Sequence, residues 1–195
     1  MPLDFKLIDE STSYSSDQLL KINSTDCPHL FFLKDFINPN LIDKLLNYLL
    51  TEEIAWTEEL NQEYNNRLKL NWIPESVIEE THTVLDNLTA ELNQKFNRTN
   101  KFLGLSIWKD QEGYTIGMHE KDNSVIDIAV QIYLSESTVD LATKFSFNDK
   151  ILSTDYKKNC GYLVDNSVGV PHYMNTPVPA DHIRYSLYAM WGHRG

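Results

Sequence analysis

Cysteine, glycine and long apolar runs are all scarce in this sequence of 195 residues. The only two cysteines, Cys27 and Cys160, lie too far apart for a zinc-binding spacing and are too few for a disulfide framework. The seven glycines are scattered, and no glycine-rich phosphate-binding loop occurs. No stretch approaches the roughly 20 apolar residues that a membrane-spanning helix needs, so we expect no membrane partner.

Basic residues are also in deficit. The sequence has 17 Lys and Arg residues against 28 Asp and Glu residues, which gives a formal net charge of −11. A protein that binds duplex nucleic acid must neutralise phosphates with Lys and Arg, so this balance argues against a nucleic-acid partner. The first residues, MPLDFKLIDESTS, have acids where a signal peptide has a basic start and an apolar stretch, which predicts a cytoplasmic protein.

The length and the 42% hydrophobic content predict one domain that spans residues 1–195. Residues 1–28 are mixed and polar, and we expect a loose N-terminal arm there, with an edge strand near residues 5–8. Residues 29–100 are expected to form a helical support, in which a strand over 29–37 precedes amphipathic helices over 39–53 and 74–96. Asn38 and Pro39 suit the cap and first turn of the first helix.

From residue 101 onward the apolar period changes from that of a helix to that of a strand. Strands are predicted over residues 102–108, 114–118, 126–134, 142–147, 150–152, 161–164 and 184–191. Helices first and strands afterwards, without βαβ alternation, are typical of an α+β layout. The pattern predicts a double-sheet jelly roll over residues 101–195, backed by the two N-terminal helices.

Candidate metal ligands gather where a rigid strand begins. The tetrapeptide HEKD, which starts at His119, runs into the longest β-type apolar segment, residues 125–134, and His172 follows later in a turn before another strand. Two histidines and one carboxylate on one face of an ion are the usual ligands of non-haem Fe(II) sites that use dioxygen. His119, Asp122 and His172 are therefore predicted to bind Fe(II), and no other catalytic residue is assigned. The alternative for His119 is a turn histidine among solvated acids.

Arg184 and Ser186 lie two residues apart in the last predicted strand, so their side chains project to the same face. A planar, permanently charged guanidinium suits a buried bidentate contact with a carboxylate. The two residues are therefore a candidate site for one carboxylate of a dicarboxylic cosubstrate. The alternative for Arg184 is an ion pair with a structural acid.

These segments resemble the Fe(II)- and 2-oxoglutarate-dependent oxygenases of the prolyl-hydroxylase-like branch. The resemblance lies in GYTIGMHEKDNSVIDIAVQIYL, NSVGVPH and RYSLYAMW, and the opening FFLKDFINPNLIDKLLNYLL is similar as well. It implies a double-stranded β-helix core with iron on His119, Asp122 and His172. It also implies 2-oxoglutarate on Arg184 and Ser186. The implied reaction uses dioxygen and 2-oxoglutarate, with ascorbate as an auxiliary reductant, to hydroxylate a C–H bond of a peptidyl side chain or a small molecule.

Two departures from the family pattern bear on the function. One residue separates the family's close pair of ligands, whereas two separate His119 from Asp122, and Lys121 fills the strict acid position. A β-bulge could absorb the extra residue, or Glu120 or water could complete the ligand set. An inactive jelly-roll binding protein and a cupin-like metal enzyme without 2-oxoglutarate therefore stay as alternatives. Met190 stands where the family's nucleic-acid demethylases carry a second arginine, which argues against base demethylation.

Overall fold

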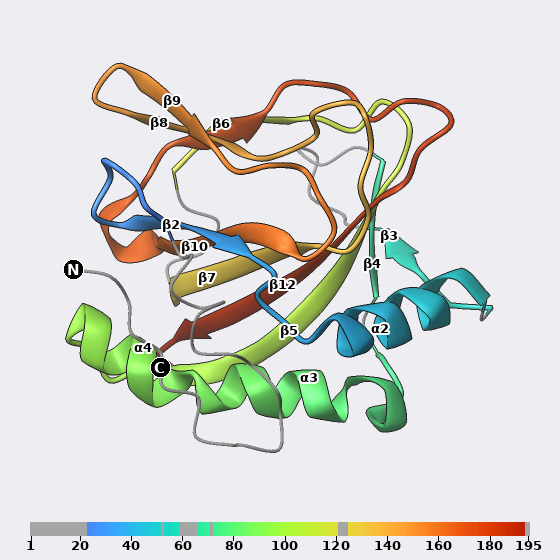
Figure 1. The fold of residues 1–195 in the computed structure, drawn as a ribbon, viewed down its shortest axis with the longest axis horizontal. Coiled ribbons are helices and arrows are strands. Elements are labelled where there is room, and N and C mark those ends of the chain that lie inside the picture. The colour runs from blue at the N-terminus through green and yellow to red at the C-terminus, as the bar shows by residue number, and fades with distance from the viewer. Residues whose placement is uncertain (1–22, 52, 59–65, 71, 121–124, 194–195) are drawn as a thin grey trace.

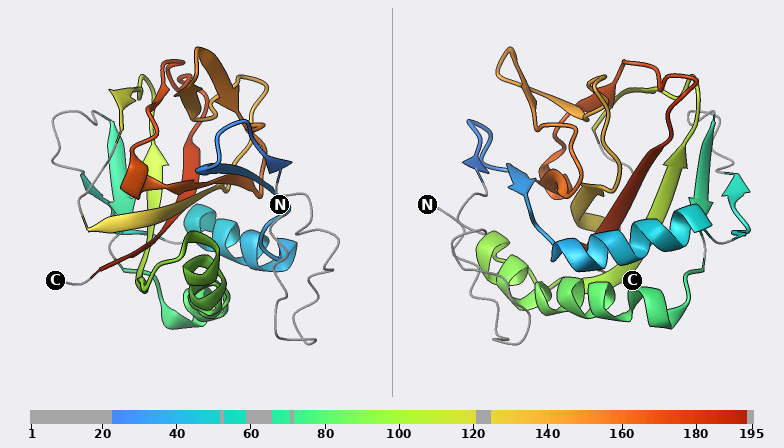
Figure 2. Two further views of the ribbon diagram at one scale, coloured as in Figure 1. Left: turned by 90° about the vertical axis from the view of Figure 1, so that its left-hand side faces the viewer. Right: turned by 45° about the vertical axis from the view of Figure 1, so that its right-hand side comes forward.

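The structure is a computed structural model that describes residues 23–51, 53–58, 66–70, 72–120 and 125–193. In this part of the chain a large and a small antiparallel sheet face each other, and helices cover the outer face of the large sheet (Figures 1 and 2). The architecture is therefore jelly-roll-like, as predicted. None of the described helices is long and apolar enough to cross a membrane.

The large sheet has eight strands in the order β1-β2-β10-β7-β12-β5-β4-β3. Every pair of neighbours in it is antiparallel. Its strands are β1 (Asn23–Ser24), β2 (Leu30–Lys34), β3 (Thr57–Glu58), β4 (Arg67–Leu70), β5 (Lys101–Asp110), β7 (Ile126–Tyr133), β10 (Cys160–Asp165) and β12 (Arg184–Gly192). The strand β1 falls within the predicted loose arm, whereas the edge strand expected near residues 5–8 lies outside the described residues.

The small sheet has four strands in the order β6-β11-β8-β9. They are β6 (Ile116–His119), β8 (Lys144–Phe147), β9 (Lys150–Ser153) and β11 (His172–Met174), and a short 3-10 helix, η1 (Asn166–Val168), precedes β11. The prediction of a turn at His172 is wrong, because this residue begins β11 and pairs with β6. Three residues directly after Pro171 are too few to show strand alternation in the sequence.

The helical region is more divided than predicted. Helix α2 (Pro39–Thr51) confirms the first predicted helix, and Asn38 Oδ1 accepts a hydrogen bond from Asn40 N at 2.9 Å, as a capping residue does. The expected single helix over 74–96 is wrong, since α3 (Glu75–Asn87) and α4 (Thr89–Phe96) meet at Leu88. Asp86 and Asn87, which compete with the helix for backbone hydrogen bonds, lie just before this break. The support therefore has three described helices rather than two.

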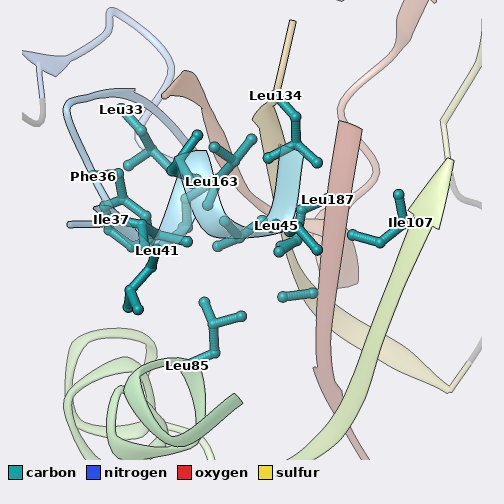
Figure 3. Packing of buried hydrophobic residues seen from close by; sticks show 14 of the residues in the cluster. Leu33, Phe36, Ile37, Leu41, Leu45, Leu85, Ile107, Leu134, Leu163 and Leu187 are labelled. Atoms are coloured by element: carbon teal, nitrogen blue, oxygen red, sulfur yellow. The ribbon is translucent and has the colours of Figure 1, made fainter. Parts of the chain in front are cut away.

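The main core lies between the helices and the large sheet (Figure 3). Alternate residues of β12, namely Tyr185, Leu187, Ala189 and Trp191, join this core. The intervening residues of β12 face the space between the two sheets, where Arg184, Tyr188 and Met190 line a cavity. Both faces of the central strands are buried, which explains why β7 reads as an almost continuous apolar run.

Gly161 in β10 offers a test of how closely the central strands approach. A Cβ atom at this position would lie 1.9 Å from the Gln131 carbonyl oxygen in β7, whereas a Cβ at Gly117 would meet no atom within 4 Å. We expect Gly161→Ala to lower the free energy of unfolding by about 1–3 kcal/mol, because backbone must move to admit the methyl group. Gly117→Ala should change it by less than about 0.5 kcal/mol. Urea unfolding of both variants checks this, and equal stabilities would contradict the observed packing.

Candidate active site

A cavity of about 280 Å³ lies between the two sheets. Polar and charged side chains from both sheets line it, and they include the residues that the sequence marked out at His119, His172 and Arg184. Aromatic and apolar side chains such as Trp108, Ile116 and Met190 line the rest of its wall. The fold therefore brings segments that are distant in the sequence into one site.

His119 and His172 lie side by side, because β6 and β11 pair with these two residues in register. Their ring centroids are 4.1 Å apart with the ring planes tilted by 54°. Each Nδ1 lies at hydrogen-bonding distance from a carbonyl oxygen two residues earlier, of Gly117 at 2.9 Å and of Val170 at 2.8 Å. A carbonyl oxygen can only accept, so Nδ1 carries the proton and the lone pair of each ring is on Nε2. This is the orientation in which a backbone bond fixes a metal-ligating imidazole.

The predicted third ligand, Asp122, lies outside the described residues, so its place beside the histidines stays a prediction. Within the described part of the chain, no group of three or more His, Cys, Asp and Glu side chains could hold a metal ion. Glu120 is exposed, and its Oε2 lies 3.4 Å from where a Cβ on Gly169 would be, just after η1. Its carboxylate therefore lies against the loop that leads to His172.

A buried ion cluster forms the carboxylate end of the site. Cross-strand pairing places Asp110 of β5 directly between Arg67 of β4 and Arg184 of β12. Arg67 donates from Nε and a terminal nitrogen to both oxygens of Asp110, at 2.6 and 3.0 Å. Arg184 Nη1 donates to Asp110 Oδ2 at 2.5 Å. Asp110 is fully buried and Arg184 is only 1% exposed, so the sequence-level alternative of an arginine paired with a structural acid is present in the structure.

Arg184 nevertheless keeps donor capacity toward the cavity. Its Nε donates to the carbonyl oxygen of Leu141 at 3.0 Å, and its guanidinium carbon lies 5.1 Å from the centre of the Tyr133 ring. Nη2 makes no hydrogen bond to any residue that the structure describes. Burial disfavours the charged form and is the largest single effect, but the Asp110 carboxylate together with the Tyr133 and Tyr114 phenols raises the pKa of Arg184 above its ordinary value. The side chain is therefore a fixed cation with a donor available for an incoming carboxylate.

Ser186, the other predicted cosubstrate residue, takes part in a chain of side-chain hydrogen bonds. Tyr162 donates to Gln131 Oε1 at 2.6 Å, and Gln131 Nε2 donates to Ser186 Oγ at 2.9 Å. Ser186 is completely buried and is not among the residues that line the cavity, and its hydroxyl accepts this bond and donates to no residue that the structure describes. The chain fixes the rotamers of three polar side chains on the inner face of the large sheet.

Three residues of the site were not assigned from the sequence. No sequence pattern marks Asp110 as a site residue, because it is a single acid next to a turn. Arg67 and Lys69 alternate with leucines in a short strand, and this alternation is the pattern that could have indicated them. Both basic side chains line the cavity with Trp108. The guanidinium of Arg184 lies over the ring of Tyr133, which is fully buried and whose hydroxyl accepts a hydrogen bond from Thr143 N at 2.8 Å.

The remaining four histidines do not belong to the cavity lining, in keeping with the selection of His119 and His172. Each of them contacts a side chain elsewhere: His29 with Asp165, His82 with Phe102, His182 with Tyr156 and His193 with Asp127.

No family model matches the sequence, and no curated protein matches it. Solved structures do match. A prolyl-4-hydroxylase from Pseudomonas putida superposes with a TM-score of 0.66, over 86% of this chain and 94% of that chain, at 15% sequence identity. The chain has the fold of the Fe(II)- and 2-oxoglutarate-dependent oxygenases.

Two further structures widen the range of proteins with this oxygenase fold. A prolyl hydroxylase from Trichoplax adhaerens, solved with a peptide fragment of the hypoxia inducible factor oxygen degradation domain, is 12% identical, with a TM-score of 0.61 over 88% of this chain and 87% of that one. HygX from Streptomyces hygroscopicus, solved with nickel and 2-oxoglutarate, is 10% identical, with a TM-score of 0.63 over 92% of this chain and 87% of that one. At these identities the likeness shows the oxygenase fold alone.

Tyr156, whose ring packs against that of Tyr133, provides a pH test of the packing beside the site. Burial raises the pKa of its phenol from 10.0 to about 12. The unfolded chain therefore ionises this group before the folded protein does, so its contribution is fully present below pH 10 and is lost as the pH rises to about 12. We expect a loss of about 2–3 kcal/mol in the free energy of unfolding across this window.

Urea unfolding measured at several pH values should show this loss in the wild type. Tyr156→Phe is the control, since it lacks the titrating phenol and should lose correspondingly less stability between pH 10 and pH 12. Identical pH dependence in the two proteins would contradict the assignment.

Proposed function

We propose that the protein is an Fe(II)- and 2-oxoglutarate-dependent dioxygenase that hydroxylates a C–H bond of a peptidyl side chain or a small molecule. One observation carries the proposal: the same cavity is lined by two histidines whose Nδ1 atoms bond to backbone carbonyls and by a buried arginine whose Nη2 bonds to no described residue. The first pair suits a metal ion and the arginine suits a carboxylate, which are the two groups that this chemistry must hold together.

The two histidines of the cavity are suited to a metal ion. The imidazole rings are close enough for one ion to bind Nε2 of both, given metal–nitrogen distances of about 2 Å. His119 and His172 would hold iron, with Asp122 as the third ligand. When bound, the iron supplies oxidation of a C–H bond by dioxygen, with 2-oxoglutarate decarboxylated to succinate. Two histidines and one carboxylate leave open positions for cosubstrate and oxygen.

The chain's own residues would orient the cosubstrate and exclude water. Arg184 would bind one carboxylate of 2-oxoglutarate through Nη2, with Ser186 donating its hydroxyl proton to the same group. Trp108, Ile116 and Met190 line the cavity, and such apolar walls limit the access of water to a reacting centre. The HygX structure with nickel and 2-oxoglutarate supports this class of ligand for the fold.

Two relatives in fold support the proposed breadth of substrate. The Trichoplax adhaerens protein was solved with a peptide fragment, and HygX was also solved with hygromycin B, a small molecule. Both kinds of ligand are therefore compatible with this architecture.

A second candidate function, an inactive binding protein of the same fold, is favoured by one observation. Asp110 already supplies a carboxylate to Arg184, which is the role that a cosubstrate would otherwise take. Turnover separates the two functions, because a binding protein would hold the ligand without producing succinate.

The oxygenase proposal predicts succinate release that requires both Fe(II) and 2-oxoglutarate. His172→Ala should reduce this release by about 100-fold or more, since it removes a metal ligand. Arg184→Ala should mainly raise the concentration of 2-oxoglutarate that is needed. His82→Ala, which changes an exposed histidine outside the cavity, is the matched control and should keep wild-type activity. Iron binding without any succinate release in the wild type would reject the oxygenase and favour the binding protein.

The identity of the third ligand can be tested with a matched pair of acids. Asp122→Ala should weaken Co(II) or Fe(II) binding by about 10-fold or more, because a direct ligand is lost. Glu120→Ala should leave the affinity within about 2-fold, as its carboxylate lies against the loop near Gly169. Calorimetric titration of the metal measures both. The reverse order of effects would assign the ligand to Glu120.

A further inference from the structure

We propose that Arg67 is a positioning residue for the carboxylate site: by pairing with Asp110, it leaves Arg184 with net positive charge toward the cosubstrate. The inference rests on the proposed function and names a residue on which cosubstrate affinity depends. It starts from the row Arg67–Asp110–Arg184, which crosses three neighbouring strands of the large sheet.

The charge balance of this row is the first step. Asp110 is fully buried and contacts the buried guanidinium of Arg184 and that of Arg67, whose side chain is 11% exposed, so two positive charges contact one negative charge. The three residues of the row together have a formal net charge of +1, and its potential is weakly screened around the buried Asp110 and Arg184. A buried acid beside the binding arginine would by itself repel a carboxylate ligand. Arg67 offsets this repulsion.

The geometry of Arg67 fits this role. It binds both oxygens of Asp110, at 2.6 and 3.0 Å, whereas Arg184 contacts Oδ2 alone. Its guanidinium carbon lies 4.7 Å from the Trp108 ring centre and 4.4 Å from that of Tyr114, and these aromatic contacts stabilise the cation in one place. Since Arg67 makes the bidentate contact with Asp110, Arg184 keeps its Nη2 for a ligand.

Removal of the positive charge of Arg67 has a defined consequence. Asp110 and Arg184 would remain as a neutral pair, and an incoming carboxylate would meet a carboxylate beside its arginine without compensation. If Asp110 is also replaced by a neutral residue, no carboxylate offsets the positive charge of Arg184. Cosubstrate affinity should therefore fall in the single variant and recover in the double variant, which a purely structural role of Arg67 would not produce.

The experiment is calorimetric titration of 2-oxoglutarate into full-length protein loaded with Co(II). Arg67→Gln, which keeps a hydrogen-bond donor for Asp110 but removes the charge, should weaken binding by about 10-fold. Arg67→Lys should stay within about 3-fold of wild type, because the charge is kept. Arg67→Gln combined with Asp110→Asn should return to within about 3-fold. In turnover, Arg67→Gln should raise the KM for 2-oxoglutarate and leave kcat within about 2-fold.

Lys109→Met provides the matched control. Lys109 is next to Asp110 in β5 but projects to the opposite face, where its ammonium lies 5.3 Å from the Trp56 ring centre. Its loss changes the net charge of the protein equally, and binding should stay within about 2-fold.

The outcomes separate the two proposals. If the wild type loaded with Co(II) fails to bind 2-oxoglutarate, the proposed function is wrong and the role of Arg67 falls with it. If the wild type binds and Arg67→Gln binds equally well, only the role of Arg67 is overturned. A double variant that binds more weakly than Arg67→Gln also overturns it, because packing rather than charge would then explain the effect. Should Arg67→Gln fail to fold, Arg67→Lys and the double variant still test the role of Arg67, since both must bind within about 3-fold of wild type.

Discussion

The buried carboxylate of Asp110 is the interaction on which the inner face of the large sheet depends. It joins side chains from β4, β5 and β12, whose backbones already pair, so backbone register and side-chain charge reinforce each other. A buried ion pair contributes little net stability over an apolar substitute, but loss of one partner costs about 3–5 kcal/mol because a charge is left alone. Here two guanidiniums contact one carboxylate, and both arginines line a cavity. The cluster therefore presents positive charge to an anion that enters the cavity. The same three residues therefore bear on both the stability of the sheet and its chemistry.

The two faces of the large sheet differ in composition and in what they contact. The face toward α2, α3 and α4 is apolar and forms the main core, whereas the face toward the small sheet has arginine, glutamine, serine and tyrosine side chains. Strict alternation along β12 is what allows one strand to serve both. The small sheet adds the two histidines from strands that are only a few residues long. The metal side and the carboxylate side of the site thus come from different sheets, and the spacing of the sheets determines what fits between them.

Much of this arrangement could be predicted. Helix α2, with its capping Asn38, and most of the strands follow from periodicity and local turn chemistry, since these depend on residues a few positions apart. The division of the predicted second helix at Leu88 and the existence of β11 were missed, because a weak helical segment and a three-residue strand have little local pattern of their own. His119 and His172 were chosen by residue type and context, and the structure places them beside each other.

What the sequence alone determined is which residues are able to do this chemistry and which faces of the elements they occupy, since both follow from side-chain type and a period of two or 3.6. Only the tertiary structure decided which of them meet. Asp110 lies 43 positions from Arg67 and 74 from Arg184, and nothing local to any of the three signals the others. Their contact arises from strand order in the sheet, a long-range property that is set by how the whole chain buries its apolar faces.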